Sequence, residues 1–217
     1  MFRKGNTVGS ANIYFGNFYC DNELAYILGL WCADGYYWSS SIGLSNVDTA
    51  LIERFKRFLL KFFGEERLKL KIYYPSNIQK PESGNVSATY LPMRKVKQIA
   101  YQIYANSRPL LRIIREARSY ILKMRDHACV KAYFAGRFDG DGSVAKDRKS
   151  DCRIVYSNEN EARIDQQLLI RLGIETRLYS IERQIHSAYM CREAEREDFL
   201  IPSNPFEFDP KIYIRTP

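Results

Sequence analysis

Residues 27–35 read ILGLWCADG, and residues 134–142 read FAGRFDGDG. Both segments place glycine third, a small residue seventh, aspartate eighth and glycine ninth. A small residue followed by Asp-Gly also occurs in ordinary turns, so a single copy would carry little information. Two copies at matched positions of one chain predict a tandem repeat, in which Asp34 and Asp141 are equivalent residues.

Each segment lies at the end of a predicted helix. Residues 23–33 are largely apolar and contain no proline, and Asp21 or Asn22 is a suitable N-cap. Residues 131–140 form the second helix by the same pattern. We therefore expect two helices that each end at an aspartate.

Small residues would let these two helices pack closely. Gly29 and Ala33 are four residues apart, as are Gly136 and Gly140, so each pair lies on one helix face. Two backbones can approach across such faces, although glycine inside a helix costs about 1 kcal/mol relative to alanine. Packing side by side would bring the two aspartates together. Adjacent carboxylates at helix C-termini favour a hard divalent cation, which can activate water against a phosphodiester.

Composition indicates the kind of partner. The chain has 217 residues and a formal charge of +8, with 33 Lys and Arg against 25 Asp and Glu. This excess of positive charge favours a polyanionic partner. Five scattered cysteines without a C-x-x-C pair indicate a reducing compartment. With no long apolar run, we expect an intracellular protein of a prokaryote or an organelle that is not secreted and has no membrane span.

The two halves continue alike after each motif, in the order helix, two strands, helix, two strands, helix. In the first half the predicted strands are residues 41–46, 67–74 and 86–91, and the further helices are 48–63 and 95–105. In the second half the strands are 152–158, 176–182 and 187–191, and the further helices are 161–172 and 193–200. A helix at 108–123 joins the halves. Periods of two and of 3.6 residues support these assignments.

The predicted fold class is therefore α+β, a pseudo-twofold tandem αββαββα repeat in which each half contributes an antiparallel sheet. Four segments follow from the repeat. They are an N-terminal extension at residues 1–20, a first half at 21–107, a linker helix at 108–124 and a second half at 125–217.

The two segments resemble the motif of the LAGLIDADG homing endonucleases, and the resemblance covers nearly the whole chain from about Asn22. It implies a monomer whose motif helices pack at the interface and whose sheets form a saddle on double-stranded DNA. It further implies a site-specific, free-standing or intron-encoded endonuclease. Such an enzyme uses Mg²⁺, or another divalent cation such as Mn²⁺, to hydrolyse one phosphodiester per strand across the minor groove, leaving short 3′ overhangs.

The resemblance also implies which residues act. Asp34 and Asp141 would be catalytic and bind metal, and the backbone carbonyls of Ala33 and Gly140 would help to bind it. Neither the position after the first hairpin nor its counterpart holds a lysine, so the sequence names no basic residue that would stabilise the transition state.

Two asparagines have alternative roles. Asn46 and Asn158 would lie beside the acids in the family and order water there. The equally good alternative is that both are N-caps of the helices that follow. At motif position six, Asp139 is expected to serve packing or capping. Arg137 replaces an apolar residue and is expected to face solvent or DNA.

The predicted strand faces carry cations. Period two places Arg67, Lys69, Lys71 and Tyr73 on one face, opposite an apolar face. The second half offers a looser set for the same purpose, namely Lys146, Arg148, Lys149, Arg153, Arg177, Tyr179 and Arg183. Such side chains can neutralise phosphates or donate to guanine edges. A solvated strand face is the alternative interpretation.

The hairpins that follow the two motifs differ in length, Asp34 to Asn46 against Asp141 to Asn158. We therefore expect a long, asymmetric DNA target. Two other functions are compatible with the sequence, an intron RNA maturase and a DNA-binding regulator on the same fold. Retention of both aspartates favours cleavage, because neither alternative requires them.

Overall fold

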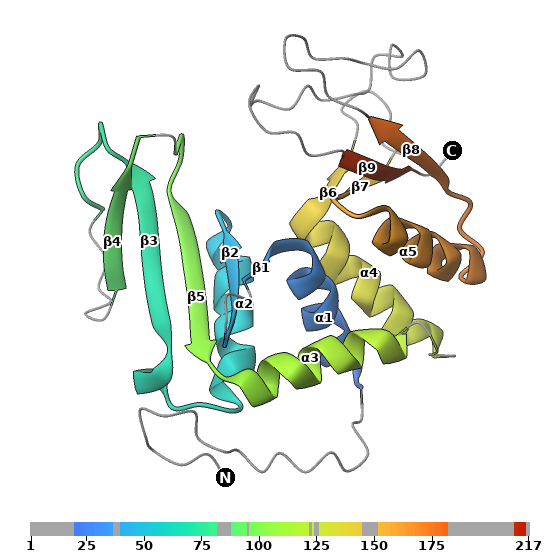
Figure 1. The fold of residues 1–217 in the computed structure, drawn as a ribbon, viewed down its shortest axis with the longest axis horizontal. Helices are drawn as coiled ribbons and strands as arrows, with labels where there is room; N and C mark the ends of the chain where they lie inside the picture. Colours follow the sequence, from blue (N-terminus) through green and yellow to red (C-terminus); the bar gives the residue numbers. More distant parts are fainter. Residues whose placement is uncertain are drawn as a thin grey trace. The chain divides into compact units, whose positions relative to one another are not determined.

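The chain divides into two units, Met1–Gly140 and Asp141–Pro217, in this computed structural model (Figure 1). The structure describes residues 20–36, 40–81, 88–94, 96–121, 123, 126–144, 152–181 and 211–215. No helix among these residues is long and apolar enough to cross a membrane.

The elements of the first unit alternate between helices and strands. In chain order they are α1 (Asn22–Asp34), β1 (Gly35–Tyr36), β2 (Ser41–Asn46), α2 (Thr49–Leu60), the 3₁₀ turn η1 (Glu65–Arg67), β3 (Lys69–Pro75), β4 (Ala88–Met93), β5 (Ala100–Asn106), α3 (Arg108–Ile121) and α4 (His127–Asp141). The last residue of α4 already belongs to the second unit.

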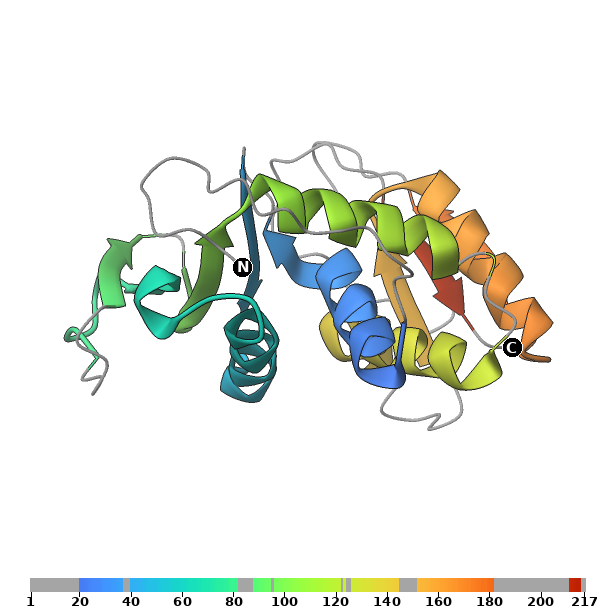
Figure 2. The same cartoon turned by 90° about the horizontal axis from the view of Figure 1, so that it is seen from below.

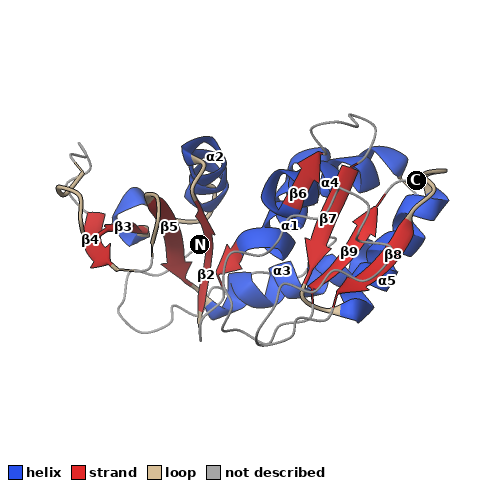
Figure 3. Ribbon diagram, turned by 90° about the horizontal axis from the view of Figure 1, so that it is seen from above, coloured by secondary structure: helices blue, strands red, loops and turns tan. Residues whose placement is uncertain are grey.

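The strands of the first unit form a five-stranded sheet in the order β1-β2-β5-β3-β4 (Figure 3). The pairs β1–β2, β2–β5 and β5–β3 are antiparallel, as the sequence predicts. The edge pair β3–β4 is parallel and departs from that expectation. The middle position of the sheet belongs to β5, which follows the other strands along the chain.

The central strand is the main correction to the predicted elements. A helix predicted at residues 95–105 is wrong, because Ala100–Asn106 forms β5. Ile103 and Ala105 alternate with polar and aromatic neighbours and are buried, which is the period of a strand. Hydrogen bonds to a strand on each side outweigh the local helix preference of the segment.

One face of this sheet and the helices form the core of the first unit. Ile42 and Leu44 of β2 are fully buried, as are Phe55 and Leu59 of α2. Both α2 and α3 contact β2, and α3 also runs alongside α1 (Figures 1 and 2). The Ser107 hydroxyl accepts a hydrogen bond from the Leu110 backbone N–H and so caps the start of α3.

The helices of the two motifs, α1 and α4, pack backbone to backbone. A Cβ added to Gly29 would lie 1.9 Å from the Tyr133 carbonyl oxygen. Reciprocally, a Cβ added to Gly136 would lie 2.0 Å from the Tyr26 carbonyl oxygen. Figure 2 shows the two helices side by side. The predicted close approach through small residues is therefore confirmed within the first unit.

A polar contact also joins α1 to α4. The Tyr26 hydroxyl donates a 2.5 Å hydrogen bond to Asp139 Oδ2. The Arg54 guanidinium carbon lies 3.3 Å from the centroid of the Tyr26 ring. Burial, followed by the contact with Asp139, raises the pKa of Tyr26 to about 12. Asp139 thus serves packing between the motif helices, in agreement with its predicted role.

The second unit repeats this arrangement in a shorter form. It contains β6 (Gly142–Val144), β7 (Cys152–Tyr156), α5 (Glu159–Arg171), β8 (Arg177–Ile181) and β9 (Lys211–Arg215). Its sheet is antiparallel and has the order β6-β7-β9-β8. The order β1-β2-β5-β3 of the first unit is the same topology, which bears out the predicted tandem repeat. The strand and helix predicted at residues 187–191 and 193–200 lie outside the described residues.

The packing boundary falls at the end of α4, whereas the repeat in the sequence suggests a boundary near residue 125. The difference follows from the contact between α1 and α4, which groups most of the second motif with the first unit. Among the described residues, α3 is likewise part of this unit, since its buried leucines and isoleucines face β2 and α1.

Candidate functional site

Asp34 is the last residue of α1, and a neighbouring strand fixes its carboxylate. The Asn46 side-chain amide donates a 2.7 Å hydrogen bond to Asp34 Oδ2. The carbonyl oxygen of the same amide accepts a hydrogen bond from the Asp48 backbone N–H at 2.8 Å. Both ends of the Asn46 side chain are therefore held, and the orientation of the Asp34 carboxylate is set before any ligand binds.

Hydrogen bonds show what each of the two asparagines contacts. Asn46 lies beside the acid and is not a cap, because Asp48 is the N-cap of α2 and accepts a hydrogen bond from the Ala50 N–H. Asn158 is the N-cap of α5 and accepts from the Glu161 N–H at 3.2 Å. The structure therefore shows Asn46 bound to the acid of the first motif and Asn158 capping the helix that follows the second.

Asp34 is a partly buried acid. Burial raises the pKa of its carboxyl above the usual value, while the hydrogen bond from Asn46 and the positive charge of Arg137 lower it. Burial has the largest effect, so the carboxylate form is less stable here than in water. A cation bound to its oxygens would offset that loss, so the acid suits a hard divalent metal.

The second motif contributes a small residue at this point. A Cβ added to Gly140 would lie 2.3 Å from the Ala33 Cβ and 3.0 Å from Asp34 Oδ2. Glycine is required here because any side chain would press on the acid and its neighbour. The predicted carbonyl ligands, Ala33 and Gly140, therefore meet at the end of α1.

Asp141 directly follows Gly140 and is the last residue of α4. In the second unit, β6 begins at the next residue and pairs with β7, as β1 follows Asp34 and pairs with β2. Each aspartate thus stands where a motif helix passes into the first strand of a hairpin. Among the described residues, no group of three or more His, Cys, Asp or Glu could hold a metal ion.

The first unit carries a cationic and aromatic strand face, which we call the lysine–tyrosine face: Lys69, Lys71 and Tyr73 of β3 with Gln102 and Tyr104 of β5. The register pairs Lys69 with Tyr104 and Lys71 with Gln102, so these residues share one side of the sheet. Each lysine ammonium lies over the Tyr104 ring, at 5.9 and 5.3 Å from its centroid. Lys69 is exposed, and Lys71 is partly exposed.

Hydrogen bonds order the polar residues of this face. The Tyr73 hydroxyl donates to Gln102 Oε1 at 3.0 Å, and Gln102 Nε2 donates to the Ser45 hydroxyl at 3.0 Å. The chain of contacts crosses three strands and fixes the Gln102 amide, which is 7% exposed. A face built this way presents its lysines from a rigid support.

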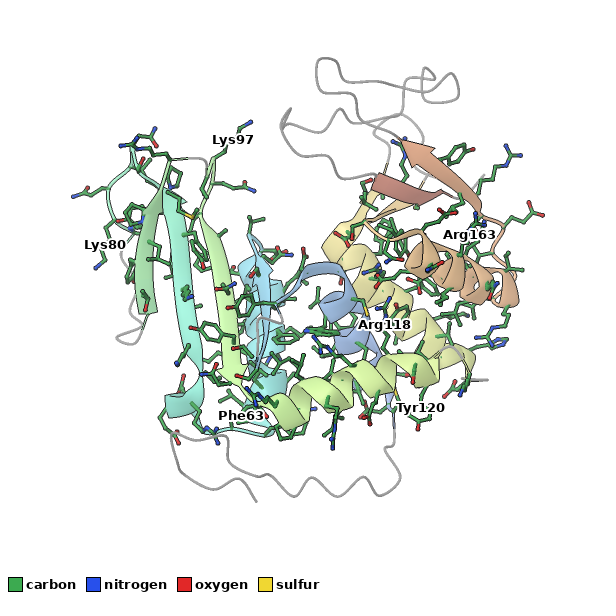
Figure 4. All side chains as sticks on the ribbon, in the orientation of Figure 1. Phe63, Lys80, Lys97, Arg118, Tyr120 and Arg163 are labelled. Carbon is green, nitrogen blue, oxygen red and sulfur yellow. The ribbon has the colours of Figure 1, made fainter. Side chains whose placement is uncertain are left out.

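Two further lysines of the first unit lie outside the strands. Lys80 lies in the turn after β3, with its ammonium 4.3 Å from the Tyr90 ring centroid. Lys97 precedes β5 and is exposed. Figure 4 shows both side chains extending away from the ribbon.

Arg67 does not belong to the predicted strand row. It lies in η1 rather than in β3, and its guanidinium carbon is 5.2 Å from the Phe63 ring centroid. Tyr104 and Gln102 were missed by the sequence analysis, because their segment was assigned to a helix. The alternation Gln102-Ile103-Tyr104-Ala105 is the signal that would have found them.

The residues of the second unit that are predicted to contact DNA differ in their exposure. Arg177 is exposed on β8 and Tyr179 is partly exposed. Arg153 is only 5% exposed, so we do not include it among direct contacts. The register places Arg215 between Arg153 and Arg177, a neighbour that the sequence analysis did not name. The remaining candidates, Lys146, Arg148, Lys149 and Arg183, lie outside the described residues.

Arg137 also differs from expectation. It was predicted to face solvent or DNA, but it is 2% exposed. A Cβ added to Gly29 on α1 would lie 2.8 Å from the Arg137 backbone nitrogen, so Arg137 lies at the contact between the two motif helices. From there its charge acts on Asp34.

A family model described as a LAGLIDADG-like domain matches residues 21–116 and 128–200, which together cover most of the chain. The protein belongs to the LAGLIDADG-like family. The two matched segments contain both motifs and both hairpins described above. No curated protein sequence matches this member of the family.

Solved structures of I-DmoI share the fold. Crystal structures of I-DmoI in complex with DNA and Mn, and with DNA and Ca, match with TM-scores of 0.50 and 0.52 at 15% identity. The matches cover 90% of this chain in both cases, and 89% and 83% of those chains. The N-terminal LAGLIDADG domain of DUF199/WhiA matches with a TM-score of 0.47 at 17% identity, covering 94% of this chain and 79% of that one.

Proposed function

We propose that this LAGLIDADG protein is a site-specific, double-strand DNA endonuclease that requires a divalent metal, with Asp34 and Asp141 as its catalytic, metal-binding acids. The observation that carries this proposal is the setting of Asp34. A partly buried carboxylate is held by Asn46 at the end of a motif helix, beside Ala33 and Gly140. The sequence gives Asp141 the same place in the second motif.

The donor chemistry fits Mg²⁺ or Mn²⁺. Carboxylate and backbone carbonyl oxygens are the ligands these cations prefer, and phosphate oxygens of bound DNA would supply others. The metal, when bound, supplies charge neutralisation at the scissile phosphate and a water of lowered pKa. I-DmoI, which shares the fold, was crystallised with DNA and Mn, and a variant of it with target DNA and Mg.

The residues of this chain would orient the catalytic carboxylate and bind the DNA backbone. Asn46 holds the Asp34 carboxylate in one rotation, so its oxygens need not be ordered when DNA arrives. The lysine–tyrosine face supplies positive charge for the DNA backbone, and Arg177 does so in the second unit. We propose a long, asymmetric target, since the hairpins after the two motifs differ in length.

The test is cleavage of a randomised-site or host-genomic DNA library with Mg²⁺, followed by the Asp34→Asn and Asp141→Asn variants on the selected site. We expect discrete cuts in both strands by the wild type. Each variant should lose about 10²- to 10⁴-fold in rate, the usual range for removal of one positioned acid or base. DNA binding, measured by fluorescence anisotropy in Ca²⁺, should remain close to that of the wild type.

Glu175→Gln is the matched control, because it also removes one carboxylate charge but lies exposed in the loop before β8. It should cut at the wild-type rate. Full cleavage by either aspartate variant would overturn the proposal. Tight DNA binding without cuts by the wild type would instead support the DNA-binding regulator, and tight binding of intron RNA without cuts would support the maturase.

A further inference from the structure

Two thiols meet where the motif helices begin. Cys20 directly precedes Asp21, whose side chain caps α1 by accepting a hydrogen bond from the Leu24 N–H. Cys129 lies in the first turn of α4, after Asp126, which accepts in the same way from the Ala128 N–H. Both cysteines are reduced. This thiol pair lies at the opposite end of α1 from Asp34.

The contact between the thiols is direct. The Cys129 thiol donates a hydrogen bond to the Cys20 backbone carbonyl, with 3.2 Å between sulfur and oxygen. The two thiols are also close enough for each to affect the pKa of the other. The Cys129 sulfur therefore lies at the backbone of the residue that carries the other thiol.

We propose that Cys20 and Cys129 are an oxidative modification site, at which a disulfide forms and joins the starts of the two motif helices. The bond would close a loop between residues 109 positions apart. Cross-links that close long loops restrict the unfolded chain strongly, so the oxidised protein is more stable than the reduced one.

The chemistry needs a small-molecule disulfide as the oxidant. The Cys20 thiolate attacks one sulfur of that disulfide, forms a mixed disulfide and releases one small thiolate. Cys129 then loses its proton, and its thiolate attacks the Cys20 sulfur, forming the protein disulfide and releasing the second small thiolate. The two cysteine protons pass to the released thiolates. The protein loses two electrons, and the oxidant gains them.

Exposure determines the order of the two steps. Cys20 is partly exposed and can meet the oxidant, whereas Cys129 is 3% exposed and can react only with its neighbour. Burial, followed by the charges of Cys129 and Asp21, raises the pKa of Cys20 to about 12. The first step is therefore slow at neutral pH. Its rate should rise about tenfold per pH unit over the range in which the thiol still predominates.

The experiment treats the full-length, reduced protein with oxidised glutathione at several pH values. Free thiols are then alkylated, and the digested protein is analysed by mass spectrometry. We expect a linked peptide pair containing Cys20 and Cys129, with the mass of two hydrogens lost and no glutathione attached. The melting temperature of the oxidised protein should exceed that of the reduced protein, and dithiothreitol should reverse the change.

Three serine variants separate the steps, since serine is close in size to cysteine and retains a hydrogen-bond donor. Cys129→Ser should retain glutathione on Cys20, because nothing resolves the mixed disulfide. Cys20→Ser should form neither a glutathione adduct nor a disulfide, either at residue 20 or at Cys129. Cys32→Ser is the matched control, and it should behave as the wild type. Cys32 is partly exposed, like Cys20, but it lies near the C-terminal end of α1, whereas Cys20 precedes the start of that helix.

Three results would overturn the proposal. They are a stable glutathione adduct on Cys20 of the wild type, a linked pair that excludes either cysteine, and a linked pair that leaves the melting temperature unchanged.

Discussion

Asp34 is a residue whose ionised form is disfavoured by the fold around it. Burial has the largest effect on its pKa, and the contacts with Asn46 and Arg137 offset only part of it. The native state therefore binds a proton at Asp34 more tightly than the unfolded chain does. The stabilisation from that proton is complete below the ordinary pKa of 3.8 and disappears as pH rises through the higher native pKa.

The pH dependence of the Asp34→Asn variant follows. At pH 7 and without metal, the variant lacks the disfavoured charge, so its melting temperature should exceed that of the wild type. The difference should shrink as pH falls and vanish below about 3.8, where both side chains are neutral. Thermal unfolding across this pH range, in the presence of a chelator, measures it. Glu175→Gln should show no such gain, and a lower melting temperature of Asp34→Asn at pH 7 would contradict the argument.

At the single-residue scale, the sequence identified the acids but not their surroundings. Asp34 and Asp141 follow from the repeated motif, and the N-cap Asp21 follows from local preference. The different roles of Asn46 and Asn158 depend on which backbone N–H and which carboxylate lie within reach, and these contacts are set by the hairpins. The burial of Arg137 depends in turn on the neighbouring helix.

Among the elements, α1 and α4 pack closely because glycines leave no side chain between their backbones. Gly29 and Gly136 are each placed against a backbone carbonyl of the other helix. Alanine would favour an isolated helix over glycine by about 1 kcal/mol, so propensity and packing predict opposite effects of adding a methyl group. The sign of the measured effect therefore tells which of the two dominates.

Gly136→Ala should lower the free energy of unfolding by about 1–3 kcal/mol, because the helices must separate to admit the methyl group. Chemical denaturation of the metal-free protein measures this change. Ala135→Gly, at the neighbouring exposed position of α4, is the control, and it should lose about 1 kcal/mol from helix propensity alone. A Gly136→Ala variant more stable than the wild type would show that the helices do not pack through this glycine.

Most elements could be predicted from the sequence, but β5 was assigned to a helix and no strand was predicted at β9. Strands at 41–46 and 152–156 and the helices after them have strong periods, and the structure contains them. The segment that forms β5 is short and preceded by lysines, and its pattern fits either structure. Its partners, β2 and β3, decide the outcome, and neither is adjacent to it along the chain. The sequence predicts an antiparallel sheet in each half, so the parallel edge pair β3–β4 was missed as well.

For the whole molecule, the net charge of +8 favours nucleic-acid binding only where the positive side chains are concentrated on one surface. The lysine–tyrosine face places Lys69 and Lys71 beside aromatic rings on a rigid sheet. Binding of a nucleic acid by such charges releases counterions, so affinity falls as salt rises, with a slope of about −0.9 per neutralised phosphate.

The Lys69→Ala/Lys71→Ala variant should bind DNA more weakly, and the slope of log affinity against log salt should become shallower by about 2. Titrations of the selected DNA site at several salt concentrations measure both quantities. Lys131→Ala, exposed on α4 outside the sheet, is the control and should leave the slope unchanged. A double variant with the wild-type slope would show that this face does not contact phosphates.

The position of β5 and β9 within their sheets has a consequence for how the protein folds. Each is the last strand of its sheet along the chain, yet each lies between two earlier strands. Before β9 is in place, β7 and β8 have no bond to each other and expose open edges, which are sites of mispairing between molecules. The hairpins β1–β2 and β6–β7 can form locally, but each sheet is completed only when its middle strand is inserted. That insertion should be the slow, long-range step of folding in both units. A substitution that weakens β9 would therefore reduce the yield of folded protein more than a change of equal size in β6, the edge strand.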